Sequence, residues 1–198
     1  MPRKVTTGVE KAYYAILKSD DAGTETYDPA TYLPGLREIG VVPKEEQASI
    51  YAENVLWDSE SALGEVEVTL DFTDVPPEHY SKLLGKKKAE GGGVIDNVND
   101  QAPYIALMVE KTLSGGVKEY LTLYKGKLSI PEDKAKTKEG KTDYQTKPVK
   151  GIFMPNSSGN WRYAVRSDDA EFIANKTTFD TKWGKEVIVA KEKTEAGA

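Results

Sequence analysis

A strict alternation of apolar and polar residues between positions 64 and 72 is the feature that most constrains the fold of this chain. The apolar set is Val66, Val68, Leu70 and Phe72. The polar set is Glu65, Glu67, Thr69 and Asp71. A period of two places successive side chains on opposite faces of a strand. We therefore expect a half-buried strand whose apolar face meets a core and whose acidic face points outward.

Most other segments are also predicted to be strands, because tyrosine, valine and isoleucine are concentrated in them. The predicted strands are residues 11–17, 39–42, 48–53, 104–110, 118–128, 149–154 and 161–165. Glycine-containing turns at residues 113–116 and 156–160 predict two antiparallel hairpins. Residues 24–32 and 86–93 are too polar or glycine-rich to be expected in the core.

One helix is predicted over residues 76–84. Residues 73–74 offer N-cap oxygens, and the two prolines that follow suit a first helical turn because their missing N–H groups need no partner there. Gly85 supplies the stop. The core-facing residues are expected to be Tyr80, Leu83 and Leu84. A second, short helix around residues 168–175 is weakly signalled.

Strands outnumber helices, and no alternation of strand and helix repeats along the chain. We predict a mainly β fold, an antiparallel β-sandwich with one packed α-helix and a long hairpin arm at residues 43–64. The apolar residues of this arm need a partner; they are Ile50, Tyr51, Val55, Leu56 and Trp57. The expected organisation is an N-terminal arm (1–8), one sandwich domain (9–190) and a flexible C-terminal tail (191–198).

Composition narrows the classes of function. The chain has no cysteine, which excludes a disulfide framework, a thiolate metal site and a cysteine nucleophile. Its 32 acidic and 27 basic residues give a formal charge of −5, which argues against a dedicated DNA-binding protein. We see no secretory signal and no stretch approaching the ~20 apolar residues of a membrane span, so we expect synthesis in the cytoplasm.

The candidate chemical motifs have simpler interpretations. His79, the single histidine, falls on the expected exposed face of the helix and is interpreted as a solvated surface residue. Residues 96–100 alternate oxygen ligands but lack the glycine and glutamate of a calcium loop, so we favour a turn. Residues 85–88 lack the leading glycine and the Ser or Thr of a phosphate loop. Carboxylates on the acidic strand face are interpreted as solvated and not as a glycosidase pair. We assign no catalytic, cofactor-binding or metal-binding residue.

Several segments, taken in their order, resemble the major tail protein family of long-tailed bacteriophages that infect Gram-positive bacteria. They are YYAILKSD at 13–20, ASIYAEN at 48–54, SALGEVEVTL at 61–70, LLG at 83–85, APYIAL at 102–107 and YKGKL at 124–128. The resemblance covers residues 9–165, and its most specific parts are GEVEVTL and YKGK.

The resemblance implies a structural virion protein in the phage tail, a β-sandwich that assembles as hexameric rings stacked into a tube. The genome would pass through the lumen without specific binding, and the tape measure and tail-terminating proteins would be partners. Joining subunits edge to edge would also satisfy their exposed strand edges. The outward set Glu65, Glu67, Thr69 and Asp71 is our candidate for the lumen wall, to which it would give a net negative potential. The arm residues are our candidates for contacts between subunits.

Two other functions compete with this hypothesis. A carbohydrate-binding surface module could use Trp57, Trp161 and Trp183 as stacking platforms. A hydrolase is the third alternative. Only the tube hypothesis predicts rings or long tubes of the purified protein.

Overall fold

The computed structural model describes residues 4–21, 24–132, 136–137 and 146–191. The chain divides into two compact units. The first unit comprises Met1–Pro34, Tyr104–Lys125 and Pro155–Ala198, and the second comprises Gly35–Pro103 and Gly126–Met154. Strands dominate both units and every recorded pairing is antiparallel, so the predicted mainly β fold class with a long hairpin arm is confirmed.

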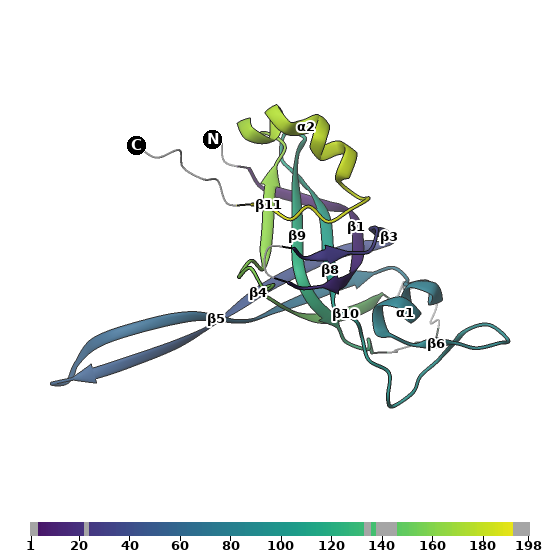
Figure 1. Ribbon diagram of the computed structural model, residues 1–198, viewed down its shortest axis with the longest axis horizontal. Helices are drawn as coiled ribbons and strands as arrows, with labels where there is room; N and C mark the ends of the chain where they lie inside the picture. The colour runs from purple at the N-terminus through teal and green to yellow at the C-terminus, as the bar shows by residue number, and fades with distance from the viewer. Residues whose placement is uncertain (1–3, 22–23, 133–135, 138–145, 192–198) are drawn as a thin grey trace. The chain divides into compact units, whose positions relative to one another are not determined.

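The first unit is a sheet in the order β2-β1-β8-β9, with β3 also paired to β1 and β11 paired to β9 (Figure 1). Its strands are β1 (Thr6–Ser19), β2 (Thr26–Tyr27), β3 (Thr31–Leu33), β8 (Ile105–Leu113), β9 (Val117–Leu128) and β11 (Arg162–Arg166). The last three residues of β9 belong to the second unit. Six successive residues of β8, from Ile105 to Glu110, are buried, which means that both faces of this strand are covered.

The turn between β8 and β9 confirms the hairpin predicted at residues 113–116. Gly115 and Gly116 have φ angles of 77° and 74°, a conformation that glycine adopts without steric cost. The predicted hairpin at residues 156–160 is wrong, because β11 pairs with β9 whereas β10 pairs with β5. Those residues still form a turn, in which Asn156 Oδ1 accepts a hydrogen bond from the backbone N–H of Asn160 at 2.8 Å.

Helix α2 (Ala170–Lys182) packs on β9 in the first unit. Asp169 caps it by accepting hydrogen bonds from the backbone N–H groups of the first turn. Phe172 and Phe179 are its buried residues and contact the ring of Tyr120 on β9, with centroids 5.6 and 4.8 Å away. The described residues thus contain two helices, α1 (Pro77–Leu84) and α2, whereas the predicted fold class had one packed helix and the second was only weakly signalled. The weakly signalled helix at 168–175 is α2, which runs a further seven residues. Its buried face consists of only two aromatic residues seven positions apart, so the sequence pattern did not show where the helix ends.

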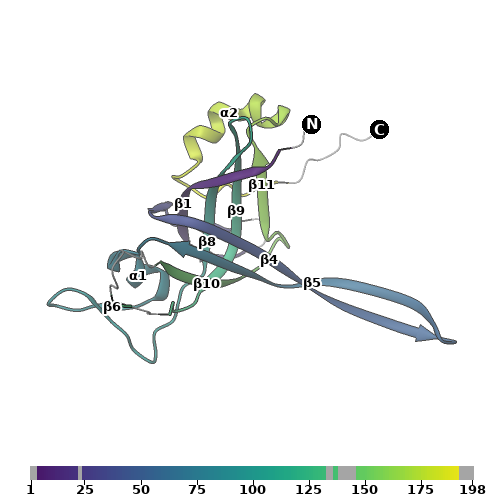
Figure 2. The ribbon, with the colours of Figure 1, turned by 180° about the vertical axis from the view of Figure 1, so that it is seen from behind.

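The second unit is built on three strands in the order β10-β5-β4 (Figure 2). Its elements are β4 (Leu36–Ala52), β5 (Val55–Phe72), α1 (Pro77–Leu84), β6 (Lys87–Lys88), β7 (Val94–Ile95) and β10 (Lys147–Met154). The alternation predicted from the sequence is confirmed, because the core of this unit includes Val66, Val68, Leu70 and Phe72. Between β4 and β5, residues 53 and 54 both have positive φ, the conformation of a tight hairpin turn.

The end of the β4–β5 hairpin projects from the second unit as the predicted arm (Figure 1). Strand β10 accompanies β5 only from Phe72 to Val66. Beyond that point the described part of the hairpin continues as two strands, and every described side chain from residue 42 to residue 62 is exposed. The two short strands predicted at 39–42 and 48–53 are one strand, β4. The polar residues between them do not interrupt the strand. Both faces of the arm are open to solvent, so polar side chains on either face remain hydrated.

Helix α1 differs from the prediction in its N-cap and in the burial of Tyr80 and His79. Its N-cap is Pro76, without a side-chain cap; the Thr73 hydroxyl instead donates to the backbone oxygen of Gly35 at 3.5 Å. The helix ends at Gly85, whose φ of 67° confirms the predicted stop. Tyr80 is only half-buried, whereas His79 is buried.

Two segments expected to lie outside the core contain short strands. Residues 24–32 contain β2 and part of β3, and residues 86–93 contain β6. Lys86 is buried and forms an ion pair with Asp96, so the ionic partner compensates for the loss of hydration. Neither described helix is long and apolar enough to cross a membrane.

Candidate functional site

The tip of the arm, defined as residues 50–58, carries a cluster of exposed apolar side chains. The five residues predicted for the arm are Ile50, Tyr51, Val55, Leu56 and Trp57, each between 51% and 72% exposed. Five large apolar side chains within eight residues form a patch that soluble proteins ordinarily cover with a partner. The structure thus brings together every arm residue that the sequence analysis named.

A change of register concentrates these residues at the tip. Ile50 pairs with Asp58, but the next residue, Tyr51, pairs with Leu56. Trp57 is therefore the extra residue of a β-bulge, where two residues of one strand oppose one residue of the other. The extra residue therefore adjoins the Tyr51–Leu56 pair along the strand. Sequence analysis could not locate it, because register depends on both strands.

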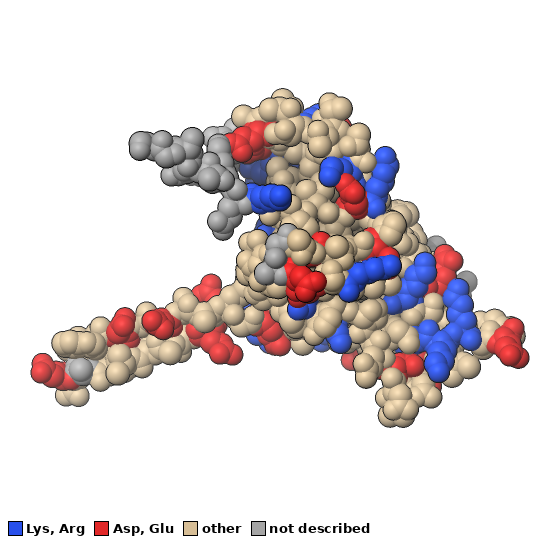
Figure 3. All heavy atoms as spheres, in the orientation of Figure 1, with Lys and Arg blue, Asp and Glu red and all other residues tan. Residues whose placement is uncertain are grey.

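The arm is also strongly acidic. Residues 45–64 contain five carboxylates and no lysine or arginine; the carboxylates are Glu45, Glu46, Glu53, Asp58 and Glu60. Removing these five from the 32 acidic residues of the chain leaves 27, which equals the 27 basic residues. Residues 45–64, which leave out Lys44 at the base of the arm, therefore carry a formal charge equal to the whole net charge of −5, and Figure 3 shows red but no blue atoms along the arm.

The second candidate surface is the outward face of β5. Glu65, Glu67 and Thr69 are exposed, and Asp71 is half-buried. Lys44 of β4 donates hydrogen bonds to both glutamates, at 2.5 Å to Glu67 and 2.9 Å to Glu65. These hydrogen bonds, the one to Glu67 first, raise the pKa of Lys44 above its ordinary value. The acidic residues therefore form a partly neutralised cluster at the base of the arm.

Residues paired across β4, β5 and β10 share this outward face. One row joins Val42, Glu67 and Ile152, and the next joins Gly40, Thr69 and Lys150. The face thus combines carboxylates with lysines and with two exposed aliphatic side chains. Sequence analysis found only the β5 residues, since alternation within one strand reveals nothing about its neighbours.

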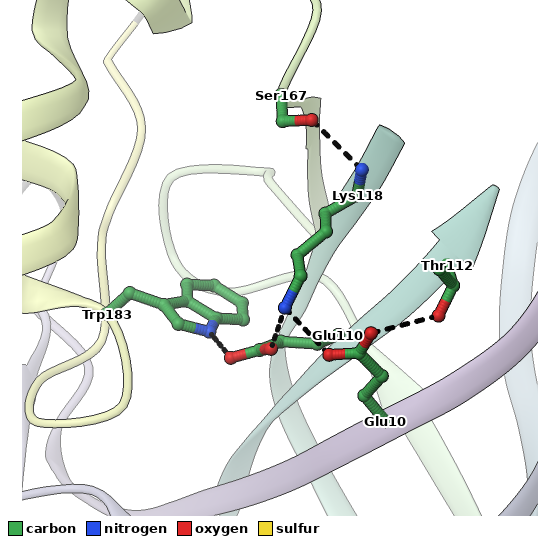
Figure 4. Close-up of polar contacts among 6 residues, drawn as sticks. All are labelled: Glu10, Glu110, Thr112, Lys118, Ser167 and Trp183. Carbon is green, nitrogen blue, oxygen red and sulfur yellow. Dashed lines mark hydrogen bonds and ion pairs between the residues drawn. The ribbon is translucent and has the colours of Figure 1, made fainter. Parts of the chain in front are cut away.

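Sequence analysis missed a polar network in the first unit that contains the buried residue Glu110 (Figure 4). The Lys118 ammonium donates to Glu10 at 2.7 Å and to Glu110 at 3.4 Å. Glu110 lies within the buried strand β8 and also accepts the indole N–H of Trp183 at 2.8 Å. Two hydrogen bonds to a buried carboxylate satisfy a charge that would otherwise be costly. No local pattern connects residues 73 positions apart.

Hydrogen bonding also shifts the pKa of Glu10. The hydrogen bond from Lys118 is the largest cause and lowers the pKa below its ordinary value, against the opposing effect of burial. The Thr112 hydroxyl donates a second hydrogen bond to the same carboxylate at 3.2 Å. The arrangement ties β1, β8 and β9 together, which is a structural role.

The residues considered for catalysis or metal binding adopt structural roles. His79 is buried rather than solvated, and burial lowers its pKa, so the imidazole favours the neutral form. Residues 96–100 form the predicted turn, in which Asn97 Oδ1 accepts from the backbone N–H of Asn99 at 2.9 Å. Among the described residues, no group of three or more His, Asp or Glu side chains is placed to hold a metal ion.

The three tryptophans differ in exposure. Trp57 is 72% exposed, whereas Trp183 is packed among aromatic rings, with its centroid 4.9 Å from that of Tyr120 and 5.3 Å from that of Phe179. Trp161 is half-buried and lies 5.9 Å from the guanidinium of Arg162. Of the three rings considered as stacking platforms for a sugar, that of Trp57 alone is well exposed, so the three do not form a series of open platforms.

Comparison with known families gives a match that spans the two candidate surfaces. A family model described as phage tail tube protein matches residues 44–149, more than half of the 198-residue chain. The matched region includes the arm, the outward face of β5 and helix α1. A comparison with curated proteins gave no match.

Proposed function

Because this chain belongs to the phage tail tube protein family, we propose that it assembles into hexameric rings that stack into a tube, and that the viral genome passes through the bore during ejection. Its role is structural and non-enzymatic. The protein is made in the host cytoplasm and resides in the tail of the virion. A tape measure protein inside the tube and tail-terminating proteins at its end complete the assembly.

The observation that carries this proposal is the arm. A two-stranded hairpin without a third strand or a packed helix is marginal on its own, and this one exposes five large apolar side chains at its tip. Packing the tip on a neighbouring copy would remove these side chains from water. This burial stabilises the contact by about 25 cal/mol per Å² of apolar surface. The arm is therefore the contact that joins one subunit to the next.

We assign the outward face of β5 to the lumen wall. Glu65, Glu67, Thr69 and Asp71 give this wall a hydrophilic surface, and Lys44 lies between the two glutamates. A wall without a basic excess lacks the counterion release that drives binding to DNA. The genome then slides through without being held.

The test is direct imaging of the purified full-length chain. We expect negative-stain electron microscopy to show rings with sixfold symmetry or hollow tubes, and sedimentation velocity to show large species that grow with protein concentration. A chain that remains monomeric at every concentration, in salt conditions that keep phage tails intact, would contradict the proposal.

A further inference from the structure

The second unit has a cluster of carboxylates on its arm and a group of exposed lysines at its opposite end. Its acidic arm extends in one direction, while the end of α1 and the β6–β7 hairpin lie on the other side of the same unit (Figures 1 and 2). We call the latter surface the lysine end; it consists of Lys82, Lys87, Lys88, Ile95 and Val98. All three lysines are exposed, and blue atoms gather in this region in Figure 3.

The acidic residues near the lysine end are partly engaged. Asp96 forms the ion pair with the buried Lys86, and Asp100 accepts the backbone N–H of Asn97 at 2.8 Å. Glu78 lies 3.7 Å from the imidazole of His79, and Glu90 follows β6 in the hairpin turn. Lys82, Lys87 and Lys88 are themselves exposed, so their ammonium groups can contact an acidic partner.

The lysine end also exposes apolar surface. Ile95 is 53% exposed and pairs directly across the hairpin with Lys87, so these two side chains share one face. Val98 is 97% exposed at the following turn. A surface that combines lysines with aliphatic side chains complements an arm that combines carboxylates with apolar side chains.

We propose that the tip of the arm of one copy docks on the lysine end of a second copy; this inference rests on the proposed function and names the surface that the arm contacts. The two surfaces are different, so the contact is heterologous and runs head to tail. Head-to-tail contacts generate rings or open filaments rather than closed dimers. Pairing one arm with another arm is disfavoured because each carries five negative charges.

Because the chain contains no cysteine, a cross-linking experiment can locate the contact. Full-length Asp58→Cys is mixed with full-length Lys87→Cys and treated with a flexible bismaleimide. We expect a covalent dimer of the two variants. The matched control mixes Asp58→Cys with Lys185→Cys, an exposed lysine of the first unit. Equal yields from the two mixtures, or no dimer from either, would overturn the docking site.

Charge reversal supplies the second test. The pair Asp58→Lys with Glu60→Lys, and separately the pair Lys87→Glu with Lys88→Glu, should each raise the critical concentration for assembly by about tenfold or more. Combining all four changes in one chain should restore assembly to within about threefold of the original value, because opposite charges again face each other. The control is Lys176→Glu with Lys185→Glu, which should leave the critical concentration unchanged.

The outcomes separate the two proposals. If the original chain never forms anything larger than a monomer, the proposed function fails and this inference fails with it. If tubes form normally in both charge-reversed variants, only the docking inference is overturned. The same holds if the variant with all four substitutions does not recover assembly. Assembly should also weaken as the salt concentration rises from about 0.05 to 0.5 M, because screening shortens the reach of the attraction; strengthening over this range would contradict the inference.

Discussion

The indole N–H of Trp183 donates a hydrogen bond to Glu110 at 2.8 Å, so the residue at the C-terminal end of α2 is tied to the most buried strand of the first unit. The same indole stacks on Phe179 of α2 with an interplanar angle of 14°. One side chain thus combines helix packing with a hydrogen bond to a buried carboxylate. The network positions α2 on its sheet.

Replacing Trp183 by phenylalanine should lower the free energy of unfolding by about 1.5–3 kcal/mol. The aromatic ring would still stack on Phe179, but the Glu110 carboxylate would lose a donor while remaining buried. Urea unfolding followed by circular dichroism measures the change. Trp161→Phe is the control, since that side chain is half-buried and should shift the midpoint much less. Equal losses in the two variants would mean that ring volume, and not the hydrogen bond, is responsible.

Stability should fall at acid pH partly through Glu10. Its pKa is lowered in the folded protein by the hydrogen bond from Lys118, below the ordinary value of 4.5. A carboxyl group with a depressed folded pKa stabilises the protein above its unfolded pKa, and this contribution is lost as the pH falls through the folded pKa. Glu10→Gln should therefore flatten the fall of unfolding free energy below about pH 4.5, with Glu60→Gln on the arm as control. Identical slopes for the variant and the original chain would exclude this role.

Local features of the structure were predictable from the sequence. The alternation of apolar and polar residues predicted which residues of β5 are buried. The positions of glycines predicted the end of α1 at Gly85 and the turn after β8. Each of these features depends on neighbours within a few residues. The arm was predictable for a related reason, because apolar residues in an otherwise polar segment have no local core to join.

Contacts between distant segments were not predictable. The hydrogen bonds of Lys44 to Glu65 and Glu67 depend on the register of β4 against β5. The burial of His79 depends on which face of α1 meets the rest of its unit, and a short helix whose two leucines are its last two residues is compatible with more than one choice. The lumen and docking assignments depend on neighbouring subunits, so they remain predictions.

The YKGK segment has a physical requirement at its glycine. A Cβ at Gly126 would overlap the ring of Phe153, a fully buried residue of β10. Gly126→Ala should therefore lower the free energy of unfolding by about 1–3 kcal/mol, the usual cost of overpacking a core. Gly8→Ala is the matched control, because nothing lies within 4 Å of the position its Cβ would occupy. Thermal unfolding of both variants measures the difference, and equal melting temperatures would refute the prediction.

Trp57 should matter for assembly and not for folding. It is 72% exposed on the arm, so Trp57→Ala should change the unfolding free energy by less than about 0.5 kcal/mol. Loss of a tryptophan from the centre of an interface commonly costs about 2 kcal/mol or more of binding, so tubes should require far higher protein concentrations. Circular dichroism and sedimentation velocity separate the two effects. An unfolded variant would place Trp57 in a core and contradict the arm interpretation, as would tubes formed at the original concentration.

The lumen assignment leads to a prediction about genome passage. Glu65 and Glu67 flank Lys44, so their charges outnumber its single charge and the cluster remains acidic. In a ring of six subunits this cluster recurs six times around the bore. Potentials from groups within a Debye length of about 8–10 Å reinforce one another and are only partly screened at the wall.

Changing Glu65 and Glu67 to lysine should leave tubes intact but slow DNA ejection. Each subunit would then present three adjacent lysines, and six such clusters would form a basic band that binds phosphates. The delay should shrink as salt rises, since counterion release weakens with ionic strength. Electron microscopy verifies the tubes, and ejection is followed by dye binding to released DNA. The control is Glu171→Lys with Glu186→Lys, which makes the same change of charge on exposed residues of the first unit, outside both the proposed wall and the arm. Normal ejection, together with a tube structure that places both glutamates on the outer surface, would refute the lumen assignment while leaving the tube itself in place.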